Sequence, residues 1–262
     1  MGEEKGYIKK HFDGMAAGQW QAYYDKEKLY ASYNFLTRKE AVLKLLRGII
    51  FDNILDVGCG SGEYLDIAKI YKCQYFGIDF SEKMVAAAIE KSHRAGLTNI
   101  HLCCANAENL PYRNRCFDVV LGIGLIEYFN NPTLMLEELR RVLKPRGILI
   151  MQSYRENFYD LHSKATYTLY QRLFKKDAGV SKKQEDILHK RYSKNDLDKI
   201  LGNHGFTILD YAYNNFRLIP YPIDCKIPSA YVRTSEFLTR VCPRHFGFFA
   251  SNYIAKYQIN SR

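Results

Sequence analysis

The chain has 262 residues, of which 47% are hydrophobic, and it carries a formal net charge of +10. This length and apolar content suit one large domain with a buried core and exclude a disordered protein. No run approaches the roughly 18 apolar residues of a membrane-spanning helix, and the charged N-terminus lacks the apolar segment of a secretory signal. The seven cysteines are an odd number and include no C-x-x-C pair. This pattern favours free thiols in the cytoplasm over disulfides or a zinc site.

The first 50 residues predict mainly helices, with many aromatic residues between Phe12 and Phe35. The apolar spacing over residues 39–46 predicts an amphipathic helix that packs on a sheet. The aromatic cluster is typical of a packing surface. Because it directly precedes the first predicted strand, we also consider it a lid over the turn that follows.

A short strand, a glycine turn and a helix are predicted over residues 53–71. The apolar strand 53–57 is typical of a parallel strand covered on both faces, and Asp56 stands near its end. Gly58, Gly60 and Gly62 then suit a turn that brings bare backbone against a ligand, before a helix over 61–71. The alternative is that the glycines only allow tight packing of that helix.

A second apolar strand over 74–80 carries Asp79, which lies 21 residues after Gly58. An acid at this spacing, at the tip of the neighbouring strand, suits hydrogen bonds to both hydroxyls of a ribose. Asp79 could instead cap the next helix. However, Ser81 is the better N-cap for a helix over 82–95, which Gly96 ends, so we favour the ribose role.

The alternation of strands and helices continues to residue 153. A strand and polar loop are predicted over 99–112, a strand over 116–129, a helix over 132–143 and a strand over 147–153. Gly122 and Gly124 again permit close approach of a ligand. This order predicts a parallel sheet built from βαβ units.

The second half of the chain is the more basic one, with a net charge of +8 over residues 151–262 against +2 over 1–150. Residues 154–192 predict a basic helical insertion, most simply a solvated face, although an acidic acceptor or RNA would also bind there. A helix starting at Ser193, a strand over 206–213, a covering loop over 214–232 and a last strand over 246–259 complete the chain.

Together, the motifs DVGCGSG, GIDFS, NAENLP, FDVVLGIGLIEYF and LEELRRVLKPRGILIM resemble those of class I S-adenosylmethionine-dependent methyltransferases. The likeness covers roughly residues 35–150 and is nearest to the ubiquinone/menaquinone-type small-molecule group. It implies an α/β, Rossmann-like, doubly wound sheet of seven strands with the last strand antiparallel. We expect a single domain with an N-terminal helical lid (1–50), a cofactor-binding core (51–153), the insertion (154–192) and a C-terminal part of the sheet (193–262).

The resemblance implies S-adenosylmethionine as cofactor, with its methionine part over the glycine turn and its amino group facing Asp56, directly or through water. Phe80 and Met84 are expected to enclose the adenine, and Arg38 to pair with the carboxylate. The expected cofactor residues are Arg38, Asp56, Gly58, Cys59, Gly60, Gly62, Asp79, Phe80, Met84, Asn106, Ala107, Glu108 and Gly122. The candidates for a catalytic base are Glu127, Tyr128 and His162; the family often has histidine where Tyr128 stands.

We expect methyl transfer to a small or lipid-like acceptor, at oxygen, with an anionic group on the acceptor suggested by the basic second half. The first alternative is a nicotinamide-dependent oxidoreductase, although its G-x-G-x-x-G pattern is not met, because Glu63 follows Gly62. The others are an RNA-directed methyltransferase, for which no RNA-binding module is recognisable, and a non-catalytic binding protein. The identity of the acceptor and the oligomeric state stay open.

Overall fold

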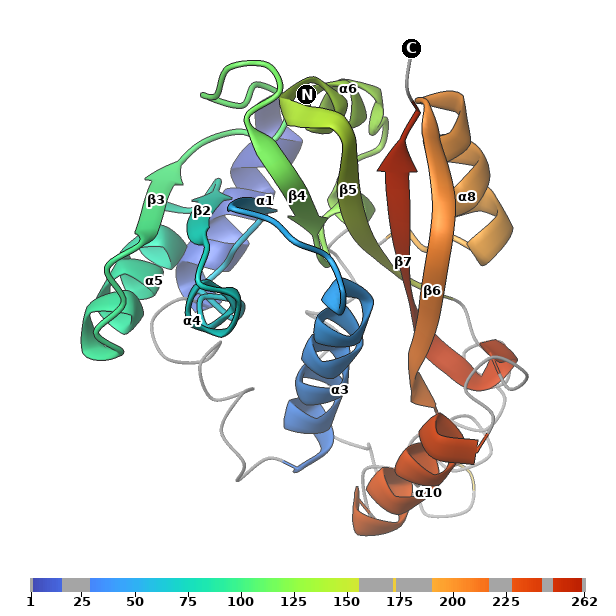
Figure 1. The fold of residues 1–262 in the computed structure, drawn as a ribbon. Helices are drawn as coiled ribbons and strands as arrows, with labels where there is room; N and C mark the ends of the chain where they lie inside the picture. The colour runs from blue at the N-terminus through green and yellow to red at the C-terminus, as the bar shows by residue number, and fades with distance from the viewer. Residues whose placement is uncertain are drawn as a thin grey trace.

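The computed structural model describes residues 2–15, 29–155, 172, 190–216, 228–241 and 247–260. Within them, seven strands form one sheet in the order β3-β2-β1-β4-β5-β7-β6 (Figure 1). The strands are β1 (Asn53–Val57), β2 (Gln74–Asp79), β3 (Ile100–Cys104), β4 (Phe117–Gly122), β5 (Leu143–Tyr154), β6 (Phe206–Phe216) and β7 (Ala250–Ile259). β7 runs antiparallel to both β5 and β6, and the other pairs are parallel. The predicted fold class is confirmed.

Helices cover both faces of this sheet. They are α1 (Gly2–Met15), α3 (Leu29–Leu46), α4 (Ile67–Tyr71), α5 (Glu82–Arg94), α6 (Thr133–Val142), α8 (Lys194–Asn203) and α10 (Pro228–Val241), with the 3-10 turns η1 (Ile126–Tyr128) and η3 (Gly247–Phe249). Successive strand residues point to opposite faces. Ile54 therefore packs in one core with α3 and α4, and Leu55 in the other with α6 and α8.

The helix caps agree with the sequence patterns. The Ser81 hydroxyl accepts the Met84 N–H at 3.2 Å, and the Ser193 hydroxyl accepts the Asp196 N–H at 3.1 Å. Gly96 follows α5 with a positive φ of 63°. Each cap provides a partner for a backbone group that a helix end leaves open.

Several predicted element bounds are wrong. The helix expected over 61–71 begins only at Ile67, because the preceding residues form turns around glycines with positive φ. The fourth strand ends at Gly122 rather than near 129, since Gly124 also has a positive φ and leads into η1. The fifth strand already starts at Leu143, with a register shift opposite residues 117–119.

The loop expected over 214–232 is shorter than predicted. β6 continues to Phe216, and a helix, α10, begins at Pro228, whose fixed φ is compatible with a helix start. Residues 217–227 lie outside the described residues. So do Trp20, His162 and nearly all of the predicted basic insertion, and the division of the chain into lid, core and insertion stays a prediction.

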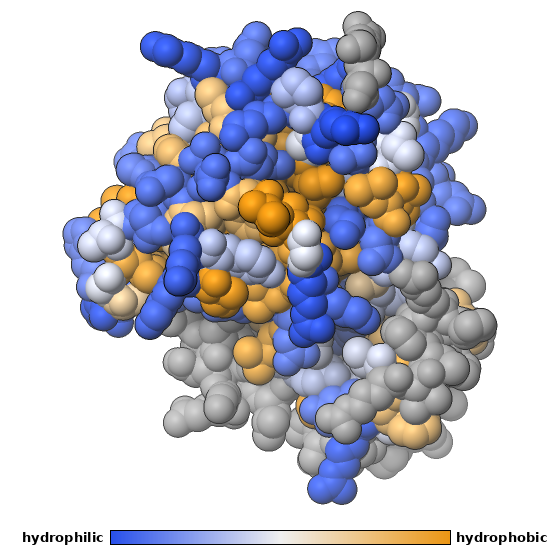
Figure 2. Space-filling view, viewed as in Figure 1, coloured by the Kyte–Doolittle hydropathy of each residue, from blue (hydrophilic) through white to orange (hydrophobic). Residues whose placement is uncertain are grey.

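The visible surface is mostly polar, with apolar side chains gathered near the middle of the view in Figure 2. The large apolar side chains that are more than half exposed include Ile50, Ile70, Phe237 and Phe248, which belong to four different segments. None of the described helices combines the length and the apolar character needed to cross a bilayer.

Candidate active site

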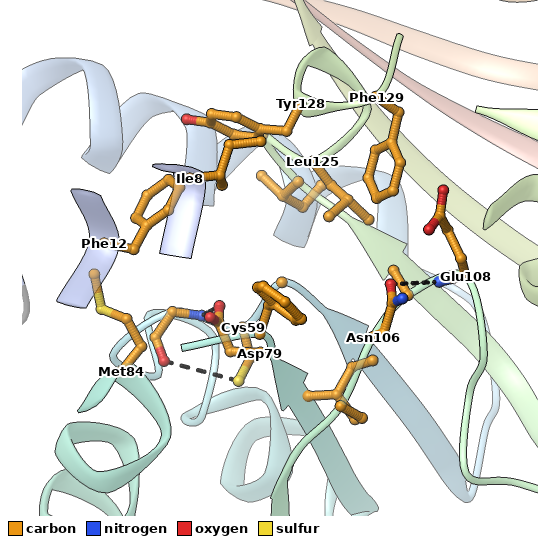
Figure 3. A pocket seen from close by; sticks show the side chains of 18 of the residues that line it. Ile8, Phe12, Cys59, Asp79, Met84, Asn106, Glu108, Leu125, Tyr128 and Phe129 are labelled. Carbon is orange, nitrogen blue, oxygen red and sulfur yellow. Dashed lines mark hydrogen bonds between the residues drawn. The ribbon is translucent and has the colours of Figure 1, made fainter. Parts of the chain in front are cut away.

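A cavity of about 370 Å³ lies beside the carboxyl ends of β1, β2 and β4. The strand order reverses between β1 and β4, and open α/β sheets bind their ligands at such a reversal. Figure 3 shows Ile8 and Phe12 of α1 beside Tyr128 on one side, and Asn106 and Glu108 on the opposite side. The cavity is therefore enclosed by segments distant in sequence.

The turn after β1 presents backbone to this cavity. The N–H groups of Gly58 and Cys59 both donate to the Ile78 carbonyl, at 2.8 and 2.9 Å, which ties the turn to β2. Gly58 has a φ of 77°, and a Cβ on it would lie 3.1 Å from Leu125 Cδ1. Only glycine fits this position without strain, so the wall stays open to a ligand.

Asp79 is held at the tip of β2 by two backbone donors. Its Oδ2 accepts the Gly60 N–H and its Oδ1 accepts the Ser81 N–H, each at 2.9 Å. Each carboxylate oxygen keeps a further lone pair for a ligand hydroxyl. Burial raises the pKa of Asp79, while the two N–H groups oppose that shift by stabilising the charged form.

The loop after β3 forms the opposite wall. Asn106 Oδ1 accepts the Glu108 N–H at 3.0 Å, so this side chain fixes its own loop. Asn106, Ala107 and Glu108 all line the cavity, together with Phe80 and Met84 from the β2–α5 segment. The predicted adenine-binding residues thus lie around one space.

Arg38 of α3 brings a buried positive charge to the cavity. The side chain is only 6% exposed, and its Nη1 donates to the Tyr154 hydroxyl at 3.5 Å. The guanidinium also lies 4.7 Å from the centre of the Phe35 ring. A cation held in this way offers a partner for a carboxylate.

Three residues predicted to hold the cofactor do not line the cavity: Asp56, Gly62 and Gly122. Asp56 is 1% exposed and accepts the Tyr75 hydroxyl at 2.6 Å. Burial, the largest cause, raises its pKa to about 7. The predicted contact of Asp56 with the cofactor, directly or through water, stays a prediction; in this geometry its carboxyl accepts the Tyr75 hydroxyl and does not line the cavity.

The two glycines have packing roles in this structure, and their predicted cofactor contacts stay predictions. A Cβ on Gly62, whose φ is 82°, would lie 2.9 Å from Leu65 Cγ and 3.3 Å from Ala88 Cβ. A Cβ on Gly122 would lie 2.9 Å from Met151 Cε. Both positions need a small residue because neighbouring side chains fill the space.

Of the two predicted catalytic candidates that the structure describes, Tyr128 lines the cavity and Glu127 does not. Burial raises its pKa, so the phenol stays protonated at neutral pH. Glu127 is 1% exposed, its Oε1 accepts the Tyr154 N–H at 2.6 Å, and burial raises its pKa to about 7. Glu127 belongs to η1 but does not line the cavity, which argues against direct proton abstraction by this residue. His162 lies outside the described residues.

Gly124, which the sequence suggested could approach a ligand, does line the cavity. Sequence reasoning missed other lining residues, which are Ile8, Glu63, Tyr64, Ile78, Ala105, Ile123, Leu125, Phe129, Asn130, Asn131, Leu134 and Tyr154. Phe12 was named only within the aromatic cluster, and its ring packs edge-on against Tyr128 at 5.3 Å. Glu63 had a usable signal, since it directly follows the glycine turn. Tyr154 had none, because it reaches the site only through the pairing of β4 with β5.

Comparison with known proteins identifies the family. Residues 52–205 match the family model described as a methyltransferase domain. The match covers more than half of the chain, so the chain belongs to this methyltransferase family. The predicted resemblance to class I S-adenosylmethionine-dependent methyltransferases is confirmed, and the family decides against a nicotinamide-dependent oxidoreductase.

Two curated relatives and one solved structure illustrate the similarity. The chain is 32% identical over 168 residues to a malonyl-[acyl-carrier protein] O-methyltransferase of Marinomonas sp., covering 63% of this chain and 58% of the relative. It is 35% identical over 133 residues to a demethylmenaquinone methyltransferase of Listeria welshimeri, covering 48% and 55%. The chain thus spans little more than half the length of these relatives.

The fold matches the crystal structure of magnesium protoporphyrin IX methyltransferase from Synechocystis PCC 6803 with bound S-adenosylhomocysteine (SAH). The TM-score is 0.65 at 17% identity, over 98% of this chain and 100% of that one. At this identity the likeness establishes the fold alone.

The residues at the cavity fit the donor that this family uses. The bare backbone at Gly58 leaves room for a ligand, Asp79 presents free lone pairs, and Arg38 supplies a positive charge. A molecule with a ribose and an amino-acid carboxylate therefore has a complementary group for each part.

Proposed function

We propose that this protein transfers a methyl group from S-adenosylmethionine to an oxygen of a small or lipid-like acceptor. One observation carries the proposal. The same cavity is lined by the glycine turn at Gly58, by the Asp79 carboxylate that backbone N–H groups hold in place, and by the buried Arg38. The family membership supports the same reaction class.

At the donor end of the cavity, Asp79 accepts the ribose hydroxyls, and Phe80 and Met84 flank the adenine next to the loop of Asn106. Arg38 pairs with the methionine carboxylate. The two N–H groups that fix the Asp79 carboxylate prepare it for this contact without further reorganisation.

The acceptor end is apolar and aromatic. The side of the cavity formed by α1 and η1 is lined by Ile8, Phe12, Tyr128 and Phe129 (Figure 3). These side chains favour an acceptor with an apolar or ring-containing body. The name of the demethylmenaquinone methyltransferase agrees with a ring-containing acceptor. The name of the malonyl-[acyl-carrier protein] O-methyltransferase supports transfer to oxygen.

The donor supplies an activated methyl group, so the residues of the chain mainly have to align the acceptor and exclude water. Phe12 and Tyr128 close the cavity from above, and the Tyr128 phenol can donate a hydrogen bond to the acceptor oxygen. Among the described lining residues there is no histidine or lysine. An acceptor oxygen that ionises readily by itself, such as a carboxyl or an acidic phenol, needs no such base.

The test combines binding with turnover. Calorimetry should detect SAH binding, and labelled S-adenosylmethionine should methylate at least one member of a panel of quinols, acyl-carrier carboxyl groups and porphyrin carboxyl groups. No SAH binding would overturn the proposal. Methylation of RNA but of none of these acceptors would replace it with an RNA-directed activity.

A further inference from the structure

We infer that Glu63 binds the ammonium group at the methionine end of the cofactor, while Arg38 pairs with the carboxylate. This inference rests on the proposed function and specifies how the cavity recognises a zwitterionic ligand. The family resemblance implies that Asp56 faces this amino group, directly or through water, whereas in the structure the Asp56 carboxyl accepts the Tyr75 hydroxyl.

Glu63 is a buried carboxylate that faces the cavity. It is 8% exposed and lines the cavity directly after the glycine turn. Its Oε1 accepts the Ser61 hydroxyl at 2.6 Å, which fixes the side chain. No lysine, arginine or histidine of the described chain forms an ion pair with it.

The charge of Glu63 acts on Lys91 of α5, where it opposes the lowering of the lysine pKa by burial, but no ion-pair contact joins the two side chains. A buried carboxylate without a direct ion pair is unfavourable, because it has lost water and gained no hydrogen-bonded cation. Asp56 and Asp79 lie close enough for the charge of Glu63 to raise the pKa of both carboxyls. The glycine turn is therefore close to several acidic side chains, and a cationic group on a ligand would reduce the repulsion among them. An ammonium group is the cation that an amino-acid ligand carries.

Asp56 does not compete for this role. Its carboxyl is 1% exposed, accepts the Tyr75 hydroxyl at 2.6 Å and does not line the cavity. Burial also favours its neutral form, which attracts a cation weakly. Glu63 is thus the acid of the turn that a ligand can reach.

The charges around the cavity select the ligand class. Arg38 is the one cation among the described lining residues, whereas Glu63, Asp79 and Glu108 are acids. One cation and one nearby acid complement the carboxylate and ammonium of an amino acid. The same acids repel the phosphates of a nucleotide, so the site favours an adenosyl amino acid over a phosphorylated adenosine ligand.

The experiment compares two ligands that differ only at this end. SAH carries the amino-acid moiety, whereas 5′-deoxy-5′-methylthioadenosine keeps the adenosyl group and the sulfur but lacks it. In calorimetry, Glu63→Gln should weaken SAH binding roughly 10- to 100-fold, the usual range for a hydrogen bond to a charged group. The affinity of the Glu63→Gln variant for methylthioadenosine should differ from that of the parent by less than about threefold, because that ligand has no ammonium group.

Two further variants complete the test. Glu63→Asp keeps the charge and should retain more SAH affinity than Glu63→Gln, and Glu90→Gln, at an exposed position of α5, should bind both ligands like the parent protein. Equal SAH binding by Glu63→Gln and the parent, or an equal loss for both ligands, overturns the inference alone. Failure of the parent protein to bind SAH would overturn the proposed function as well.

Discussion

The carboxyl groups at the ends of β1 and β2 have different environments although they lie on neighbouring strands. Asp79 faces the cavity and is held by two backbone N–H groups, whereas Asp56 is enclosed and held by Tyr75. The first geometry suits recognition of a ligand and the second suits packing of the turn. Each gives a separate test.

Asp79→Ala should reduce SAH affinity by about 100-fold or more, because each hydrogen bond to a charged group is worth about 1.5–3 kcal/mol. Calorimetry measures the loss. Asp52→Ala, which removes an exposed acid ahead of β1, is the matched control and should bind normally. Unchanged binding by a folded Asp79→Ala protein would contradict the assigned ribose contact.

Asp56→Asn should change the pH dependence of stability. The pKa of Asp56 is raised to about 7 in the folded protein, so the unfolded chain loses this proton at a lower pH and stability falls between about pH 4 and 7. The loss is at most about 4 kcal/mol, since one pKa unit corresponds to about 1.4 kcal/mol. The variant avoids this cost, so its stability relative to the parent should rise over that window and level off above pH 7.

Urea denaturation of both proteins at several pH values measures this difference. Binding of SAH by Asp56→Asn at pH 8 serves as the control for an intact turn. A constant difference in the free energy of unfolding from pH 4 to 8 would show that Asp56 ionises normally in the folded protein.

At the scale of elements, α1 bridges the two sides of the cavity. Asp13 accepts the Ser81 hydroxyl at 2.5 Å on the α5 side, and Phe12 packs against Tyr128 on the η1 side. The N-cap of α5 thus also anchors α1. We expect α1 to slow the release of a ligand held below it.

Phe12→Ala should therefore speed SAH dissociation about three- to tenfold, since an aromatic pair contributes about 0.5–1.5 kcal/mol beyond its burial. Stopped-flow displacement measures the rate. Tyr7→Ala removes an aromatic residue of the same helix that is 50% exposed and does not line the cavity, and should leave the rate unchanged. Equal rates for all three proteins would exclude a closing role for α1.

We expect an added methyl group to have opposite effects on stability at two glycines, one in the turn after β1 and one in α8. Gly62→Ala should destabilise the protein by more than about 1 kcal/mol, because its φ is 82° and the Cβ would crowd Leu65 and Ala88. In α8, a Cβ on Gly202 would meet nothing within 4 Å, so Gly202→Ala should stabilise by roughly 0.5–1 kcal/mol. The urea midpoints of the two variants, compared with the parent, test the predicted loss and the predicted gain of stability.

At the scale of the whole molecule, the cavity joins three strand ends, α1 and α3, so a bound ligand should stabilise the entire fold. SAH at 100 times its dissociation constant adds about 2.7 kcal/mol, or about 5–10 °C in Tm for a chain of this size. Differential scanning fluorimetry measures the shift, with NAD as the comparison ligand. A larger shift with NAD would contradict the ligand class that the site predicts.

The sequence predicts the elements better than their ends. The glycine turn, the Ser81 and Ser193 caps and the seven strands follow from local patterns, since each depends on neighbouring residues. The late start of α4 does not, because it depends on how the turn around Gly62 packs against Leu65. Local patterns also do not show that Asp56 faces Tyr75.

The same distinction applies to the site. Asp79 and residues 106–108 are predictable because the family motif contains them. Ile8, Phe12 and Tyr154 reach the cavity through the docking of α1 and the pairing of β5, which are contacts between distant parts of the chain. Such tertiary contacts leave little periodic signal in a single sequence.

The placement of β7 has a consequence for how the chain assembles during synthesis. β7 lies between β5 and β6 and hydrogen-bonds to both, although about 100 residues separate Ile150 from its partner Lys256. On the ribosome, β1 to β5 emerge early and can form hydrogen bonds with one another. In contrast, β6 has no strand to pair with until β7 has been synthesised. A nascent chain stalled before residue 250 should therefore be able to form the glycine turn and yet expose an unpaired edge of β5 that chaperones or other chains can bind.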